Sequence, residues 1–108
     1  MIATIDIGTN SILLLIIEKK PDGGIRVVED RIIITRLGEG LSESGIISEE
    51  AAGKTFSALR LFLDSCNRQR VTRIKAVGTA ALRNAHNAKA FLARVKTELG
   101  LDVEIISE

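Results

Sequence analysis

Residues 2–17 read IATIDIGTNSILLLII, two short apolar segments joined by a polar turn. Residues 2–7 and 12–17 are rich in isoleucine and leucine and too short for helices, so each predicts a β-strand buried on both faces. A turn of this kind needs only about two polar residues. This one carries a carboxylate, a glycine, an amide and two hydroxyls, which indicates a role besides reversing the chain.

The segments after this pair extend it into a three-stranded unit. Residues 21–24, Pro-Asp-Gly-Gly, are a strong turn signal, and residues 25–34 form another β-branched run that predicts a strand. Because the connections are tight, the three strands should form an antiparallel meander. The next stretch, TRLGEGLSESG at residues 35–45, is rich in glycine and predicts a loop.

Two helices alternate with the remaining strands. Apolar residues recur at spacings of three and four in each helix, which predicts one buried stripe per helix. Ser48 is predicted to cap the first helix and Asn87 the second. The first helix should end near Asn67, and Gly100 should close the second. The two remaining strands are predicted at residues 74–78 and 103–106. The stripes are Ala52, Phe56, Leu59, Leu63 and Cys66 in the first helix, and Phe91, Leu92, Val95 and Leu99 in the second.

The predicted order of elements is therefore β-β-β-α-β-α-β. The last three strands alternate with helices, so they should be parallel and joined by right-handed crossovers. This order predicts a single α/β domain over residues 1–108, a five-stranded mixed sheet with helices packed on it. Such an arrangement is that of a ribonuclease H-like or actin-like half.

Composition excludes several classes of partner and location. The formal net charge of +1 gives no general attraction to nucleic acid or membrane. The longest apolar run, residues 12–17, cannot span a bilayer, and the N-terminus does not read as a signal peptide. The single cysteine, Cys66, cannot form an internal disulfide and lies in a predicted helix stripe, so we expect a packing role and a cytoplasmic protein.

A basic segment and a lone histidine need separate interpretation. Arg68, Arg70, Arg73 and Lys75 lie close together, but at a helix end and a connector where cations are favourable in any case. No aromatic residues are interleaved with them, so a solvated turn is the better interpretation than nucleic-acid binding. His86 has no second histidine or cysteine nearby in sequence, and we propose no zinc site.

The turn at residues 6–11 is the first candidate site. Gly8 permits a tight turn and close approach to a ligand. Thr9, Asn10 and Ser11 supply side-chain donors and successive amides that suit phosphate oxygens. Asp6 ends the strand and suits Mg²⁺ or its waters. The alternative is a hairpin whose polar residues satisfy their own backbone.

Two further segments are candidates. Thr79 and Arg83 follow the fourth strand, where ligands of open α/β sheets collect, and the arginine fork matches phosphate oxygens. Alternatively Arg83 pairs with a surface acid, and in either case Asn87 caps a helix. The loop at residues 35–41, TRLGEGL, could lie over a site or could be a strand exit with a salt bridge.

Taken together, these segments resemble the exopolyphosphatase and guanosine pentaphosphate phosphatase family of the actin-like, sugar kinase and Hsp70 superfamily. IDIGTNS resembles its first phosphate-binding loop. RLGEGL followed by GIISEEA resembles its third-strand exit and first helix. VGTAALRNAHNAKAFLARV resembles its second loop and helix.

The resemblance implies roles for individual residues. Asp6 would be a metal-linked acid with Mg²⁺ as cofactor, Gly8 to Ser11 a phosphate cradle, and Thr79 and Arg83 contacts to the polyanion. Leu13 departs from the family pattern, because many members carry a basic residue there. Its loss weakens the expected contribution of this strand to binding of long polyphosphate.

The resemblance also implies an incomplete enzyme. The family has two such domains with the active site between them, and the general base follows the strand that matches VEIIS. Glu108 precedes that position and does not inherit the role, so we expect no catalytic residue within this chain. A complete protein would release terminal phosphate from polyphosphate or guanosine pentaphosphate by Mg²⁺-assisted attack of water. The isolated chain, without its second domain, should be inactive.

Other functions stay open at this point. The same superfamily includes actin-like ATPases and sugar kinases, and this chain could be half of one. It could also be a non-catalytic assembly module, such as a homodimer formed through an uncovered apolar surface. The sequence does not choose between polyphosphate and guanosine pentaphosphate.

Overall fold

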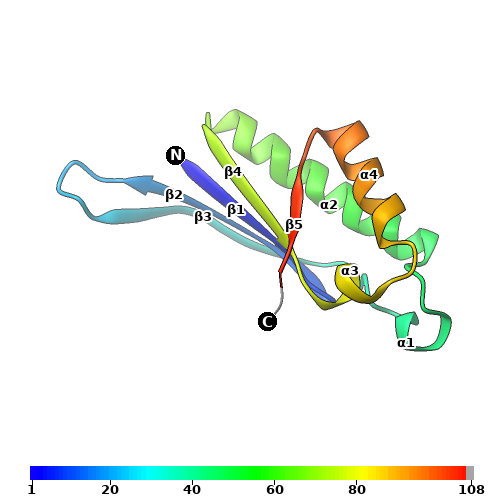
Figure 1. Ribbon diagram of the computed structural model, residues 1–108. Coiled ribbons are helices and arrows are strands. Elements are labelled where there is room, and N and C mark those ends of the chain that lie inside the picture. The colour runs from blue at the N-terminus through cyan, green and yellow to red at the C-terminus, as the bar shows by residue number, and fades with distance from the viewer. Residues whose placement is uncertain (107–108) are drawn as a thin grey trace.

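The computed structural model describes residues 1–106, and the expectation for Glu108 lies outside this range. Five strands form one sheet, and the two long helices lie together on one side of it (Figure 1). The strands are β1 Ile2–Ile7, β2 Ser11–Lys19, β3 Ile25–Ile34, β4 Arg73–Gly78 and β5 Val103–Ile105, and the helices are α1 Leu41–Ser44, α2 Glu49–Arg68, α3 Ala80–Asn84 and α4 Ala88–Leu99.

The sheet has the order β3-β2-β1-β4-β5. β1 pairs with β2 and β2 with β3 in antiparallel fashion, which confirms the meander. β4 runs parallel to β1, and β5 parallel to β4, so β3, β4 and β5 all point the same way as predicted. The carboxyl ends of β1, β3, β4 and β5 therefore meet at one edge of the sheet, which we call the loop end. The predicted actin-like α/β half is confirmed.

Helix α2 begins where its cap was predicted. The Ser48 hydroxyl accepts a hydrogen bond from the Ala51 amide at 3.1 Å, and Glu49 and Glu50 occupy the first turn. The helix ends at Arg68, one residue past the predicted Asn67. Two short helices, α1 and α3, lie within segments that we expected to be loops.

The expectation that the first two strands are buried on both faces is wrong. β1 alternates between exposed and buried residues throughout, and β2 does so from Ile12 to Ile16. Ala3, Ile5 and Ile7 of β1 face the helices and are at most 1% exposed, whereas Ile2 on the other face is 40% exposed. A continuous apolar run predicts a strand, but the helices cover only one face of this sheet.

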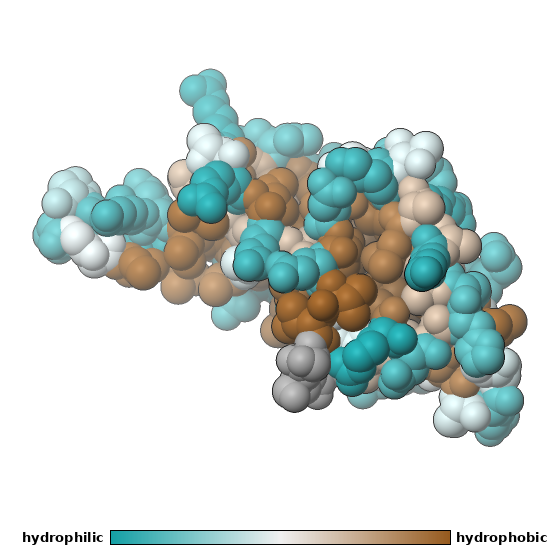
Figure 2. Space-filling model, viewed as in Figure 1, coloured by the Kyte–Doolittle hydropathy of each residue, from teal (hydrophilic) through white to brown (hydrophobic). Residues whose placement is uncertain are grey.

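We call the uncovered face the open face. Residues directly opposite each other on paired strands share a face, so the register places Leu13, Ile32 and Asp6 on it together. Hydrophobic residues reach solvent along the hairpin of β2 and β3 and beside β5 (Figure 2). The exposed apolar residues of the open face are Ile2, Leu13, Leu15, Ile25, Val27, Ile32 and Ile34.

The core lies between the sheet and the helix layer. Leu59 and Cys66 of α2 and Val95 of α4 are at most 1% exposed, which confirms these positions of the predicted stripes. Phe62 of α2, which the predicted stripe left out, is also fully buried. Leu63, Leu92 and Leu99 also pack against the core but are only partly buried. Among the described residues, no helix is long and apolar enough to cross a membrane.

Candidate functional site

Backbone hydrogen bonds join the loops at the loop end into one unit. The carbonyl of Asn10 accepts from the amides of Thr35 at 3.0 Å and Arg36 at 2.9 Å. The Thr79 amide donates to the Ile7 carbonyl at 3.2 Å, which joins the exit of β4 to the end of β1. The structure thus brings all three candidate segments of the sequence to the same edge of the sheet.

The turn between β1 and β2 closes on itself. The Gly8 amide donates to the Ser11 carbonyl at 2.9 Å, and a Cβ added at Gly8 would lie 3.1 Å from that same oxygen. A side chain at Gly8 would therefore crowd the oxygen that closes the turn. Thr9 and Asn10 lie at its tip, and Asn10 is exposed, so its amide group is accessible to a ligand.

Asp6 lies on the open face, one residue before the end of β1. Its neighbours across the sheet are Leu13 on β2 and Val77 on β4, so the position where we expected a basic residue from the resemblance lies directly beside the acid. Among residues 1–106, no group of three or more His, Cys, Asp or Glu side chains could hold a metal ion. A single exposed carboxylate beside this turn still fits Mg²⁺, which commonly takes one or two carboxylates together with substrate phosphates and waters.

Thr79 and Arg83 follow β4, on the opposite side of the turn from the loop after β3. Thr79 precedes α3 but its side chain makes no capping hydrogen bond, and the residue is half-buried. Arg83 Nη1 donates to the carbonyl of Ile106 at 3.0 Å. The alternative that Arg83 pairs with a surface acid finds no support among the described residues, and four of its five donors are left for other partners.

The loop after β3 packs directly on the turn between β1 and β2. The Gly38 amide donates to the Thr9 carbonyl at 2.9 Å, and a Cβ at Gly38 would lie only 2.2 Å from Thr9 Cγ2. A hollow of about 500 Å³, open to solvent, is lined here by Asn10, Ile34, Arg36, Gly38 and Glu39. The sequence left the role of this loop undecided, and its signals were the two glycines around Glu39 and the neighbouring Arg36.

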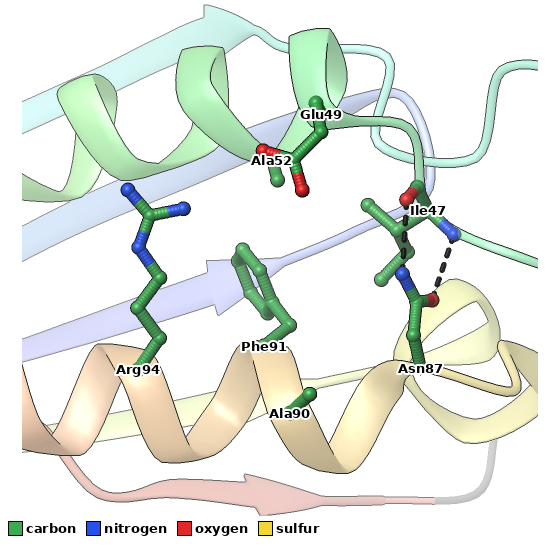
Figure 3. Close-up of a pocket in the computed structure, with 7 residues that line it drawn as sticks. All are labelled: Ile47, Glu49, Ala52, Asn87, Ala90, Phe91 and Arg94. Atoms are coloured by element: carbon green, nitrogen blue, oxygen red, sulfur yellow. Dashed lines mark hydrogen bonds between the residues drawn. The ribbon is translucent and has the colours of Figure 1, made fainter.

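Asn87 does not cap its own helix, which corrects our prediction. It does precede α4, but its side chain reaches across to the connection before α2 (Figure 3). Its Oδ1 accepts from the Ile47 amide at 2.8 Å and its Nδ2 donates to the Ile47 carbonyl at 3.0 Å. The backbone of Ile47 satisfies both the oxygen and the nitrogen of the Asn87 amide group. Asn87 thereby ties the start of α4 to the connection that leads into α2.

The cavity beside this clamp is a packing gap. It has a volume of about 120 Å³ and lies between α2 and α4, with Phe91 and Arg94 on its wall (Figure 3). Ligand pockets usually measure about 300–1,000 Å³. Space for a few waters, away from the loop end, does not make a competing site.

Other polar residues singled out in the sequence lie elsewhere. His86 packs against Gly45, whose added Cβ would meet its ring at 3.2 Å. Lys75 pairs with Glu104 at 3.6 Å, and Arg68 donates to the Ser65 hydroxyl at 3.1 Å. Burial, together with the negative charge of Glu29, raises the pKa of the Cys66 thiol, as expected for a packed and unreactive cysteine.

Comparison with known proteins places these features in a family. The model of a family described as the Ppx/GppA phosphatase family matches residues 16–108. The chain is 34% identical over 105 residues to a guanosine-5'-triphosphate,3'-diphosphate pyrophosphatase of Vibrio atlanticus strain LGP32. That match covers 97% of this chain and 21% of the relative, so the chain spans about a fifth of its length.

Solved structures agree with this result. A crystal structure of the Aquifex aeolicus member of the Ppx/GppA protein family has a TM-score of 0.94 and 40% identity, covering 98% of this chain and 34% of that chain. An exopolyphosphatase from Cytophaga hutchinsonii ATCC 33406 has a TM-score of 0.92 and 32% identity, with the same two coverages. The chain thus corresponds to about a third of these structures.

Proposed function

Because the chain belongs to the Ppx/GppA phosphatase family, we propose that it supplies the phosphate-binding half of a phosphohydrolase active site. The complete site would release terminal phosphate from polyphosphate or guanosine pentaphosphate. One observation carries the proposal: the loops after β1, β3 and β4 are hydrogen-bonded to one another at a single end of the sheet. Ligands of open α/β sheets bind at this end.

Different residues at the loop end would make different kinds of contact with a polyanion. The turn from Gly8 to Ser11 offers amides and hydroxyls, which can surround a phosphate oxygen without carrying charge. Arg83 offers a planar fork whose remaining donors match phosphate. Its hydrogen bond to Ile106 holds the guanidinium at the end of β5, so the fork is oriented before substrate arrives.

Asp6 is the residue that would hold Mg²⁺, directly or through water. When bound, Mg²⁺ supplies neutralisation of phosphate charge and orientation of the reacting groups. The open face places Asp6 beside the turn and leaves it accessible, and its neighbour Leu13 adds no competing charge. These features support the assignment of magnesium as the cofactor.

A general base and the second half of the cleft would come from a second domain. The chain spans about a third of the solved family structures, which supports this part of the proposal. Phosphoryl transfer depends mainly on positioning and electrostatic stabilisation, and this chain would supply only part of the groups needed for either. The isolated chain is therefore expected to bind polyphosphate but not to hydrolyse it. Its single buried thiol, Cys66, supports a reducing, cytoplasmic location.

A chimera tests the proposal. This chain replaces the matched third of the Aquifex aeolicus protein, and phosphate release is measured from polyphosphate, guanosine pentaphosphate and ATP. We expect release from one of the first two substrates, a loss on Arg83→Ala, and no loss on Arg60→Ala, an exposed arginine of α2. A folded chimera that turns over only ATP would favour the ATPase or kinase alternative instead.

A further inference from the structure

We propose that Arg36 binds a second phosphate group of the same polyanion, in the hollow beside the phosphate-binding turn. This inference rests on the proposed function and extends it to Arg36, a residue of the loop after β3 that has been given no part in binding so far. The hollow is lined by Asn10 from the turn and by Arg36, Gly38 and Glu39 from the loop after β3. A chain of linked phosphates that occupies the turn at Asn10 can therefore continue into the hollow.

The position of Arg36 is rigidly coupled to the turn. Its own amide donates to the Asn10 carbonyl at 2.9 Å, and two residues later the Gly38 amide donates to the Thr9 carbonyl at 2.9 Å. The contact of Gly38 with the Thr9 side chain leaves no room for a Cβ. The guanidinium is thus carried on a backbone that cannot shift without moving the turn.

The backbone of Arg36 is also strained in a way that arginine does not favour. Its φ is 52°, in the left-handed region, whereas glycine would adopt this conformation at no steric cost. A left-handed conformation of a residue other than glycine is uncommon, and such strain is concentrated at functional sites. The strain is explained if the side chain has a task that glycine cannot perform.

The charge of Arg36 is available for a ligand. Within residues 1–106 its exposed guanidinium makes no ion pair or side-chain hydrogen bond, whereas Arg26, Arg31 and Arg94 all pair with carboxylates. Glu39 shares the hollow and is likewise without an ion pair among these residues. Its negative charge opposes an anion there, so removal of that charge should strengthen phosphate binding.

Binding of sodium tripolyphosphate with Mg²⁺, measured by isothermal titration calorimetry on this chain, tests the proposal. Arg36→Ala should weaken binding by about 10-fold, as expected for loss of a charge-assisted hydrogen bond. Glu39→Gln should tighten it by about 3-fold, which is the direction of lost repulsion. Arg70→Ala is the matched control, because Arg70 also has a left-handed φ of 56° but lies at the opposite end of the sheet.

A second substitution separates binding from folding. Arg36→Gly removes the charge and relieves the backbone strain, so it should raise the melting temperature while lowering affinity as much as Arg36→Ala does. If both variants bind like the wild type while Arg83→Ala binds weakly, Arg36 is not a ligand and the proposed function stands. If the wild-type chain itself does not bind tripolyphosphate, the phosphate-binding function fails and this inference fails with it.

Discussion

The two faces of the sheet have similar chemistry and opposite surroundings. On β2, Ile12, Leu14 and Ile16 point toward the helices and are 0% exposed. Leu13 and Leu15 lie between them on the same strand and are 39% and 37% exposed. An apolar run therefore specifies a strand but does not specify which of its faces is covered. Here α2 and α4 decide this.

The two faces also differ in what they do for the site. The covered face holds the strands in register and so positions the loops, while the open face carries Asp6 and its neighbour Leu13. The apolar part of the open face spans three strands and about 30 Å along β3. Exposed apolar residues that gather on one face often mark an interaction surface, whereas singly scattered ones do not. We expect a further layer to cover it, and self-association of the isolated chain would be one way to do so.

The largest effect should come from a matched pair of substitutions on β2. Leu14→Ala should lower the free energy of unfolding by about 2–5 kcal/mol, because it opens a cavity under the helices. Leu15→Ala should cost about 1 kcal/mol or less, since this side chain is already solvated in part. Urea denaturation of both variants measures the difference. Equal losses would mean that the open face is covered in solution.

The clamp between the helices tests how the covering layer is held. Asn87→Ala should lower the free energy of unfolding by about 2 kcal/mol, because the buried backbone of Ile47 loses both its partners. Asn84→Ala, at the exposed end of α3, serves as the control and should change little. Thermal melting of the two variants decides the matter. A loss for Asn84 as large as that for Asn87 would argue against the clamp.

Substitution of two glycines compares how tightly the chain is packed at the loop end and on the outer surface of the helix layer. Gly53 lies exposed within α2 with open space around it, so Gly53→Ala should stabilise the chain by about 1 kcal/mol. Gly38→Ala should destabilise it, because its Cβ meets Thr9. Chemical denaturation shows the two signs. Stabilisation by both changes would contradict the tight packing of the loop on the turn.

The smallest effect concerns pH on the covered face. Burial raises the pKa of the Cys66 thiol above that of the unfolded chain, about 8.5. The neutral thiol therefore contributes stability that is complete below that pH and is lost as pH rises through the higher folded value. Cys66→Ala should flatten the decline in the urea midpoint between about pH 8 and 10. A loss of stability that is the same at every pH would shift the whole curve without changing this slope. An unchanged slope would assign the decline to other groups.

Prediction from sequence succeeded where local rules decide the structure. Ser48 caps α2 because its hydroxyl needs only a backbone amide three residues ahead. The apolar runs located the strands, and the spacing of Phe56, Leu59 and Cys66 located the buried side of α2. The roles of the turn, Thr79 and Arg83 in binding remain predictions, although the structure brings their segments together.

Prediction failed where a distant segment decided the outcome. Asn87 lies at a capping position, but the backbone of Ile47, 40 residues away, takes its side chain. The role of the loop after β3 was left open because Arg36 contacts the turn through its backbone, and backbone contacts leave no mark on residue type. Thr35 and Gly38 take part in the same connection.

Sequence alone therefore predicts the five strands, the two long helices, their order and the residue types of the site, because hydrophobic period, helix caps and turn residues act over a few positions. It did not predict the short helices α1 and α3. Only the tertiary structure decided which face of the sheet is covered, which partner Asn87 takes and that Arg36 adjoins the turn. These outcomes depend on which groups lie close in space. Burial and hydrogen bonding between distant segments are settled by the packing of the whole domain.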